Sequence, residues 1–120
     1  MDAQRKKELT EQYKNRKPAM GIFAVCCKLN NKCFLQQTKD FRAGINGTKM
    51  RLQVGFHTNK ELQKEWKSMG EDNFDIIIYE ELEHKDEFTD ADYAEELELL
   101  RKICEEKIIA QGKELYKQKG

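Results

Sequence analysis

The stretch GIFAVCCKLNNKCFLQQ, residues 21–37, decides the fold. Residues 21–28 combine aromatic, β-branched and small side chains without a helical period, which predicts a strand. Asn30 and Asn31 tolerate the left-handed backbone conformations of a tight turn. Residues 33–37 then predict the return strand, so the stretch is expected to form a β-hairpin.

The turn determines which side chains of the hairpin lie opposite one another. If Leu29 pairs with Lys32, Phe34 lies opposite Cys27. This register is the one expected from a two-residue turn at the asparagines.

Residues 40–52 follow the hairpin with the apolar pattern of a helix. Gly44 and Gly47 each cost about 1 kcal/mol in a helix interior. The sequence therefore predicts a weakened helix, or a helix with a break.

Two further helices and one strand follow. Thr58 and Glu61 form a capping-box pattern that starts a helix. Residues 73–82 are expected to form a third strand with apolar side chains covered on both faces. Thr89 is expected to cap a last helix that has an apolar stripe.

These elements divide the chain into three parts. Residues 1–18 predict an N-terminal helical extension, with Leu9 and Tyr13 as a thin apolar face. Residues 19–110 predict one α+β domain, a small three-stranded antiparallel-type sheet flanked by helices. Residues 111–120 predict a polar C-terminal tail.

Charge is separated along the chain, although its formal net value is zero, with 22 basic and 22 acidic residues among 120. Residues 1–67 hold fifteen Lys or Arg against six Asp or Glu, whereas residues 71–98 hold thirteen acids and one base. A bulk polycation is thus excluded. Two opposite solvated faces or one basic binding face would each explain the split.

The apolar runs are short. The longest of them is Ile76-Ile77-Ile78-Tyr79, whereas a membrane-spanning helix needs roughly 20 apolar residues. No signal-peptide pattern stands at the N-terminus. We therefore expect a cytoplasmic protein without a membrane partner.

The four cysteines do not have the paired spacing of a structural zinc site. Neighbouring residues on a strand point to opposite faces, so Cys26 and Cys27 are poorly placed to share one ion. Free thiols are the main expectation, and a soft metal held by these two, Cys33 and Cys104 is the alternative.

Several short motifs occur in a characteristic order. Gly21-Ile22-Phe23 is followed after ten residues by Phe34-Leu35-Gln36, then by Lys39-Asp40-Phe41, by the segment 57–63 and by Glu80-Glu81-Leu82. In order and spacing they resemble the catalytic module of the GIY-YIG homing endonucleases, over about residues 21–100. The resemblance implies a GIY-YIG-like fold and a nuclease that cuts phosphodiesters with one divalent metal such as Mg²⁺.

The resemblance also implies a set of reactive groups, most of which this sequence lacks. The two tyrosine positions of the hairpin are Phe23 and Phe34, whose rings have no hydroxyl to relay a proton. The arginine position falls on Gly44 and the helix histidine position on Thr48. Gln36 replaces a glycine. The resemblance therefore implies a site without intact catalytic residues.

Two roles are still open in this comparison. His57 matches a histidine that some members of the family carry, or it is a loop residue near a helix N-terminus. Glu96 best fits the metal-binding glutamate. The favourable dipole at a helix N-terminus would explain the same acids equally well.

Two functions follow as hypotheses. The first is a catalytically degenerate, non-enzymatic domain without a cofactor that binds nucleic acid or a protein partner. Its candidate nucleic-acid-binding residues are Lys28, Lys32, Lys39, Arg42, Lys49 and Arg51. The alternative is a divergent metal-dependent endonuclease that hydrolyses DNA phosphodiester bonds, using Glu96 and Lys49.

Overall fold

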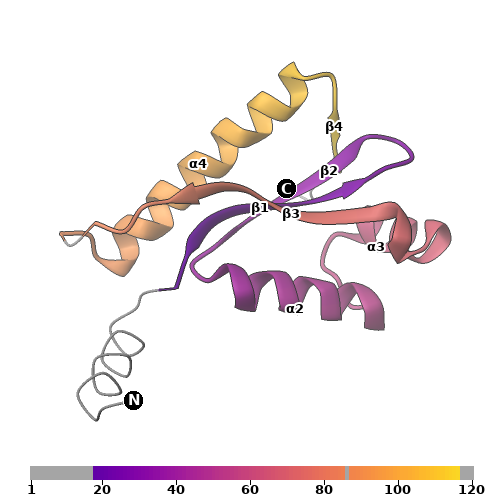
Figure 1. The fold of residues 1–120 in the computed structure, drawn as a ribbon, viewed down its shortest axis with the longest axis horizontal. Coiled ribbons are helices and arrows are strands. Elements are labelled where there is room, and N and C mark those ends of the chain that lie inside the picture. The colour runs from indigo at the N-terminus through magenta and orange to yellow at the C-terminus, as the bar shows by residue number, and fades with distance from the viewer. Residues whose placement is uncertain (1–17, 86, 117–120) are drawn as a thin grey trace, which may run out of the picture.

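The computed structural model describes residues 18–85 and 87–116, which form a sheet with helices on both faces (Figure 1). The predicted N-terminal helical extension lies outside the described residues, apart from Pro18. The elements, in chain order, are β1 (Met20–Cys27), β2 (Lys32–Thr38), α2 (Phe41–Val54), α3 (Lys60–Met69), the short 3-10 helix η1 (Glu71–Asn73), β3 (Phe74–Leu82), α4 (Asp90–Ala110) and β4 (Glu114–Leu115).

The sheet has four strands in the order β3-β1-β2-β4. Strand β1 is antiparallel to β2 and to β3, and β4 pairs in parallel with β2. The prediction of three strands was wrong, because the sheet has a fourth strand, β4. This strand lies in the stretch predicted to be a polar tail. Tyr116 follows β4 and is only 2% exposed. Two apolar side chains, Leu115 and Tyr116, thus hold this short strand against the core.

The register of the hairpin differs from the expected one by two positions. Val25 lies opposite Phe34, and Cys26 lies opposite Cys33. The turn is longer than two residues, because Asn31 adopts a left-handed backbone with φ 58° and the side chain of Asn30 accepts a bond from the N–H of Lys32. A shift of two leaves every side chain on its expected face.

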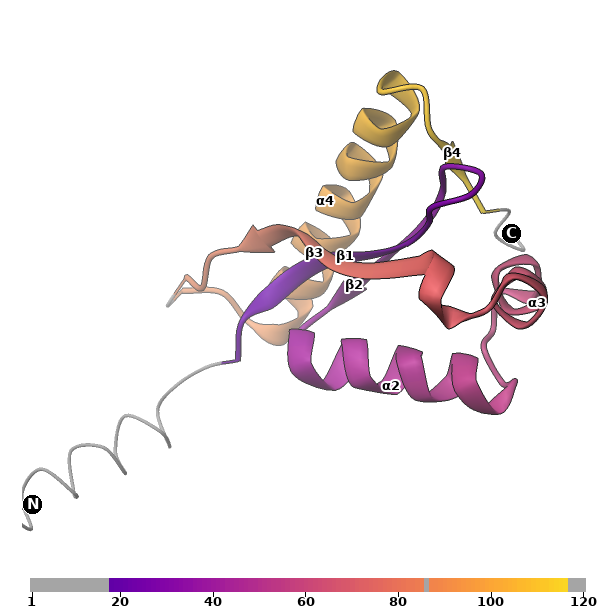
Figure 2. The ribbon, with the colours of Figure 1, turned by 45° about the vertical axis from the view of Figure 1, so that its right-hand side comes forward.

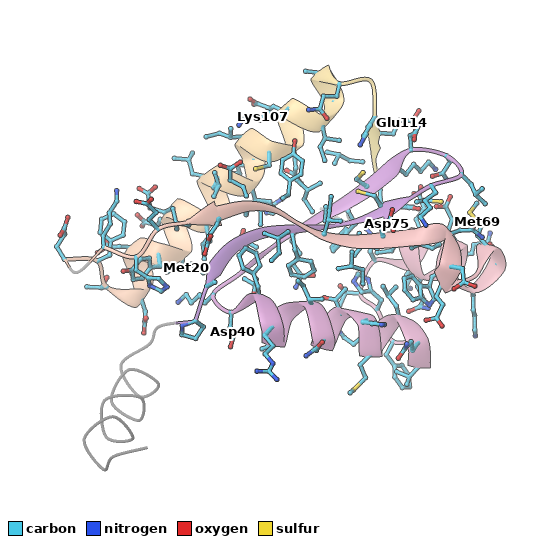
Figure 3. All side chains as sticks on the ribbon, viewed as in Figure 1. Met20, Asp40, Met69, Asp75, Lys107 and Glu114 are labelled. Atoms are coloured by element: carbon cyan, nitrogen blue, oxygen red, sulfur yellow. The ribbon has the colours of Figure 1, made fainter. Side chains whose placement is uncertain are left out.

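The two faces of the sheet pack against different helices (Figures 1 and 2). Phe23 and Val25 point into the cluster beneath α2 and α3. Ile22 and Ala24 point into the cluster beneath α4. Side chains fill the space on both sides of the sheet (Figure 3). The alternation of β1 is therefore apolar on both faces, as a central strand requires.

The helix starts were predicted with mixed success. Helix α2 runs for 14 residues without the break allowed for, and Asp40 caps it by accepting from the N–H of Ala43. Helix α3 begins after Asn59, whose side chain accepts from the N–H of Leu62, so the prediction of Thr58 as the cap was wrong. The Thr89 cap of α4 is confirmed.

Strand β3 is an edge strand. Ile77 and Ile78 are 46% and 57% exposed, so the expectation that both faces of this strand are covered was wrong. A register irregularity between Ile22 and Phe23 disturbs the pairing beside them. Within the part of the chain that the structure describes, no helix is both long and apolar enough to cross a bilayer.

Candidate functional site

The positions singled out in the hairpin and in α2 meet beneath α2, on one face of the sheet. Phe23 is fully buried there, and Phe34 packs half-buried against the same cluster. Gln36 lies opposite Phe23 in the register, so its side chain shares this face. The structure thus brings together residues that lie far apart in the sequence.

Gly44 brings α2 against the sheet at this point. A Cβ built on Gly44 would lie 2.6 Å from Thr38 Oγ1 and 3.2 Å from Phe23 Cε1. Both separations are shorter than an ordinary van der Waals contact. The position that the resemblance assigns to an arginine therefore has no room for even a methyl group in this packing.

Thr48 is buried and takes part in a short polar chain. Its hydroxyl donates to Gln36 Oε1 at 3.4 Å and accepts from Arg51 Nη2 at 3.4 Å. Since Arg51 is exposed, this chain links the buried face of the sheet to the molecular surface. The position that the resemblance assigns to a histidine thus still forms hydrogen bonds, through Thr48.

His57 lies against Phe34, with the ring centroids 5.1 Å apart and the planes nearly perpendicular. Its Nδ1 accepts the backbone N–H of Asn59 at 3.0 Å, and its own backbone N–H donates to Gln63 Oε1. Burial lowers the pKa of His57, and the positive charge of Arg51 acts in the same direction. The ring is therefore held neutral in a fixed orientation at the start of α3.

A cavity of about 350 Å³ opens beside these residues, along β2. Phe34 and Gln36 line it from one face of β2, and Arg101 of α4 lines it from the other. The Nε of Arg101 donates to Gln37 Oε1, and its Nη1 pairs with Glu105 at 3.0 Å. The cavity, called the notch below, thus contains one guanidinium, whose charge the Glu105 carboxylate partly neutralises.

Glu96 lies apart from this cavity. It is half-buried on α4 and is not among the residues that line the notch. Among residues 18–85 and 87–116, no three His, Cys, Asp or Glu side chains are grouped so that they could hold a metal ion. The four cysteines, all described, are free thiols. The side chains around Glu96 therefore do not fit a multi-ligand cation site.

Three of the predicted nucleic-acid-binding residues interact with other parts of the fold. Lys28 pairs with Asp75 at 3.5 Å. Lys32 lies 2.9 Å from Glu61 and also pairs with Glu65 of α3. The third, Lys39, donates to the backbone carbonyl at the first residue of α4. These three lysines lie in or next to the hairpin, and their partners lie on β3, α3 and α4.

The other three, Arg42, Lys49 and Arg51, are exposed on α2. Arg42 and Lys49 are seven residues apart and share one stripe of the helix. Arg51 lies on the opposite flank and reaches Thr48. Among the predicted nucleic-acid-binding residues, therefore, Arg51 is the one that contacts the polar chain beneath α2.

Arg101, Asn59 and Gln63 also belong to this site, although none of them was predicted as a site residue. Gln63 joins two elements, because its Nε2 donates to the Leu52 carbonyl of α2 while its Oε1 accepts from His57. Arg101 reaches the notch across 64 positions of sequence. Only the position of Asn59 before an apolar helical pattern signals its capping role in advance.

The order hairpin, two helices, strand and long helix, with the Phe23, Phe34 and Gly44 positions meeting beneath α2, defines a GIY-YIG-like fold. The catalytic domain of the homing endonuclease I-TevI has this fold: it is 19% identical, covers 82% of this chain and 99% of its own, and superposes with a TM-score of 0.64. A point mutant of the intron endonuclease I-TevI catalytic domain matches at 20% identity and 0.64, over 82% of this chain and 92% of its own.

At this level of identity the likeness establishes the fold alone. No protein-family model matches the sequence. No curated protein matches it significantly either.

Proposed function

We propose that this chain is a non-catalytic GIY-YIG-like module that binds nucleic acid through the surface of α2 and α3. The observation that carries the proposal is the distribution of charge between the two faces of the sheet. The helices on one face are basic at their surface, and the helix on the other face is acidic.

The basic surface consists of six exposed side chains on α2 and α3. They are Arg42, Lys49, Arg51, Lys60, Lys64 and Lys67. Helix α2 contains no acidic residue. The two acids of α3, Glu61 and Glu65, both pair with Lys32. The lysines of α3 follow one another at intervals of four and three, on the side of the helix away from buried Leu62 and Trp66.

The opposite face carries the compensating charge. Helix α4 contains seven acidic and three basic residues. The sheet and its two cores separate this helix from the basic surface (Figure 2). A neutral protein arranged in this way attracts phosphate to one side and repels it from the other, which orients a polyanion on the α2 and α3 side.

The positions beneath α2 support a binding role without catalysis. Phe23 and Phe34 have no hydroxyl, and Gly44 has no side chain to stabilise charge on a phosphate. General acid and base groups each contribute factors of about 10² to 10⁴ to a rate. Without the two hydroxyls and the arginine, hydrolysis would fall close to background.

Phe56 adds an aromatic group beside the basic surface. It follows α2 directly, is 78% exposed, and its backbone N–H donates to the carbonyl of Arg51. Phe23 and Trp66 are buried, whereas Phe56 is open to a nucleobase. An exposed phenyl ring among cations is a platform for stacking a nucleobase.

A salt titration of DNA binding tests the proposal. With three to six phosphate contacts, the logarithm of the binding constant should fall with the logarithm of salt concentration with a slope of roughly −3 to −5. Absence of binding at low salt, or binding that does not change with salt, would contradict the nucleic-acid role and favour a protein partner.

Nicking of supercoiled plasmid in the presence of Mg²⁺ tests the alternative nuclease. We expect no cleavage above the buffer background. Metal-dependent nicking that disappears in Glu96→Ala would overturn the non-catalytic part of the proposal and leave the binding part standing.

A further inference from the structure

Cys26 and Cys33 lie directly opposite each other across the β1–β2 hairpin. Directly opposed residues of an antiparallel pair have Cα atoms about 4.5 to 5.5 Å apart. A disulfide spans Cα separations of about 4.4 to 6.8 Å. The two cysteines can therefore be joined without rearranging the hairpin.

A cavity of about 300 Å³ gives small molecules access to this pair. Cys26 and Cys33 line it together with Lys113, which follows α4. Cys26 is half-buried, while Cys33 is 1% exposed. A molecule the size of hydrogen peroxide fits such a space.

The two thiols differ in acidity. A hydrogen bond from Cys26 lowers the pKa of the Cys33 thiol, and the positive charge of Lys113 lowers it further, against the opposite effect of burial. The same pairing raises the pKa of Cys26, as does its burial. The hydrogen bond and Lys113 therefore favour ionisation of Cys33 over that of Cys26.

The other two cysteines differ from this pair, although Cys27 also lines the cavity. Cys27 is buried, and its Sγ donates to the sulfur of Met69 at 3.6 Å. Cys104 is completely buried on α4, and burial raises the pKa of its thiol. Neither has a cysteine as its partner across a strand pair.

We propose that Cys33 and Cys26 form a peroxide-oxidisable dithiol, with Cys33 as the attacking thiolate and Cys26 as the resolving thiol. The Cys33 sulfur attacks one oxygen of hydrogen peroxide, the O–O bond breaks, and the departing hydroxide takes a proton to leave as water. The resulting sulfenic acid is attacked by the Cys26 sulfur, the S–O bond breaks, and a second water leaves with the Cys26 proton. The two sulfurs lose two electrons and the peroxide gains them.

The proposal is independent of nucleic-acid binding, because the pair lies on the α4 side of the sheet. The effect of the disulfide is local. It links β1 to β2 next to the residues that pair with β4, since Cys33 is also the partner of Leu115. A thiol reductant would reverse it.

Mass spectrometry of the full chain after treatment with stoichiometric hydrogen peroxide tests the proposal. The intact mass should fall by two hydrogens. Trypsin cleaves after Lys28 and Lys32, so the disulfide should join two separate peptides. A Cys27→Ser variant should form the same bond, which removes the ambiguity between the adjacent cysteines. Dithiothreitol should restore the original mass.

Dimedone, which labels sulfenic acids, separates the roles of the two thiols. In Cys26→Ser the label should accumulate on Cys33, and in the wild type it should not. A bond to Cys27 or Cys104, or a wild-type chain that keeps all its thiols under peroxide, would overturn the proposal. The wild-type mapping decides by itself if the Cys26→Ser variant fails to fold.

Discussion

Gly44 of α2 lies so close to Phe23 of β1 that a Cβ on the glycine would come within 3.2 Å of the phenyl ring. The same Cβ would lie 2.9 Å from the Cβ of Thr38, an atom that the backbone of β2 fixes in place. The helix can therefore sit at this distance from the sheet only with glycine at position 44.

Replacing Gly44 with alanine should destabilise the fold by about 1 to 3 kcal/mol, because the helix must move away from Phe23 and Thr38. Alanine would otherwise stabilise a helix interior by roughly 0.5 to 1 kcal/mol relative to glycine. The control is Gly47→Ala, whose Cβ would meet nothing closer than the Arg51 guanidinium at 3.7 Å. Urea unfolding should show opposite signs for the two variants, and equal effects would contradict the packing argument.

Tyr116 shows how far the fold could be predicted from sequence at the C-terminal end. Apart from Leu115 the residues around it are polar, so nothing in their pattern distinguishes a tail from a two-residue strand. The burial of Tyr116 depends on Lys32 and Cys33, which are more than 80 positions away and pair with β4. The fourth strand is thus a tertiary effect, not a local propensity.

Truncating Tyr116 to alanine should lower the free energy of unfolding by about 3 to 5 kcal/mol, because a buried aromatic ring is lost. Tyr116→Phe keeps the ring and removes only the hydroxyl, so its effect should be within about 1 kcal/mol. Both values can be read from chemical denaturation. A small effect of the alanine variant would show that the C-terminal strand does not contribute to the core.

Other parts of the fold followed from local chemistry. The apolar alternation of β1 and the Thr89 cap of α4 depend on neighbours within a few residues, so the sequence predicts them correctly. The register of the hairpin did not follow, because Asn30 and Asn31 are compatible with more than one turn length. At the start of α3, Thr58 and Asn59 are both good caps. In the structure the side chain of Asn59 accepts from the N–H of Leu62.

The candidate site likewise has features that the sequence predicts and features that it does not. The resemblance assigned both Phe34 and His57 to the candidate site. Their edge contact, and the chain from Gln36 through Thr48 to Arg51, depend on how α2 lies on the sheet. Spacing along the sequence carries no information on that distance.

The buried state of His57 predicts a pH dependence of stability. Its pKa is lowered in the folded protein, so the unfolded chain binds the proton more readily. This contribution is fully present above the unfolded value near 6.5 and is lost as the pH falls below it. In His57→Gln the loss of stability between pH 7.5 and pH 5.5 should be smaller, by at most about 1.4 kcal/mol per pH unit. Thermal or urea unfolding at several pH values measures it.

The second histidine provides the control for this titration. His84→Gln leaves His57 and its bond from Asn59 in place, so it should keep the wild-type difference between the two pH values. If His57→Gln and His84→Gln change the pH profile equally, burial at the start of α3 is not the cause.

Exposed lysines on the two faces of the sheet should differ in their effect on DNA binding. Removing Lys49 from α2 should reduce the salt slope by about one, as expected for one lost phosphate contact. Lys102→Ala is the matched control, because this lysine is equally exposed on acidic α4 and lies 3.6 Å from Glu98. Filter binding or fluorescence anisotropy over a range of salt concentrations measures both. Equal slopes for the two variants would remove α2 from the interface.

Phe56 should contribute to affinity in a way that salt does not reveal. Stacking of one base on an aromatic ring is worth about 1 to 3 kcal/mol, so Phe56→Ala should weaken binding to single-stranded DNA by that amount. The salt slope should stay unchanged, since no charge is removed. Val54→Ala is the control, because Val54 is 58% exposed, also apolar and only two residues away, but has no ring to stack. If both variants weaken binding alike, the contribution of this surface is apolar contact and not stacking. The nearby Arg and Lys side chains would then act without an aromatic platform.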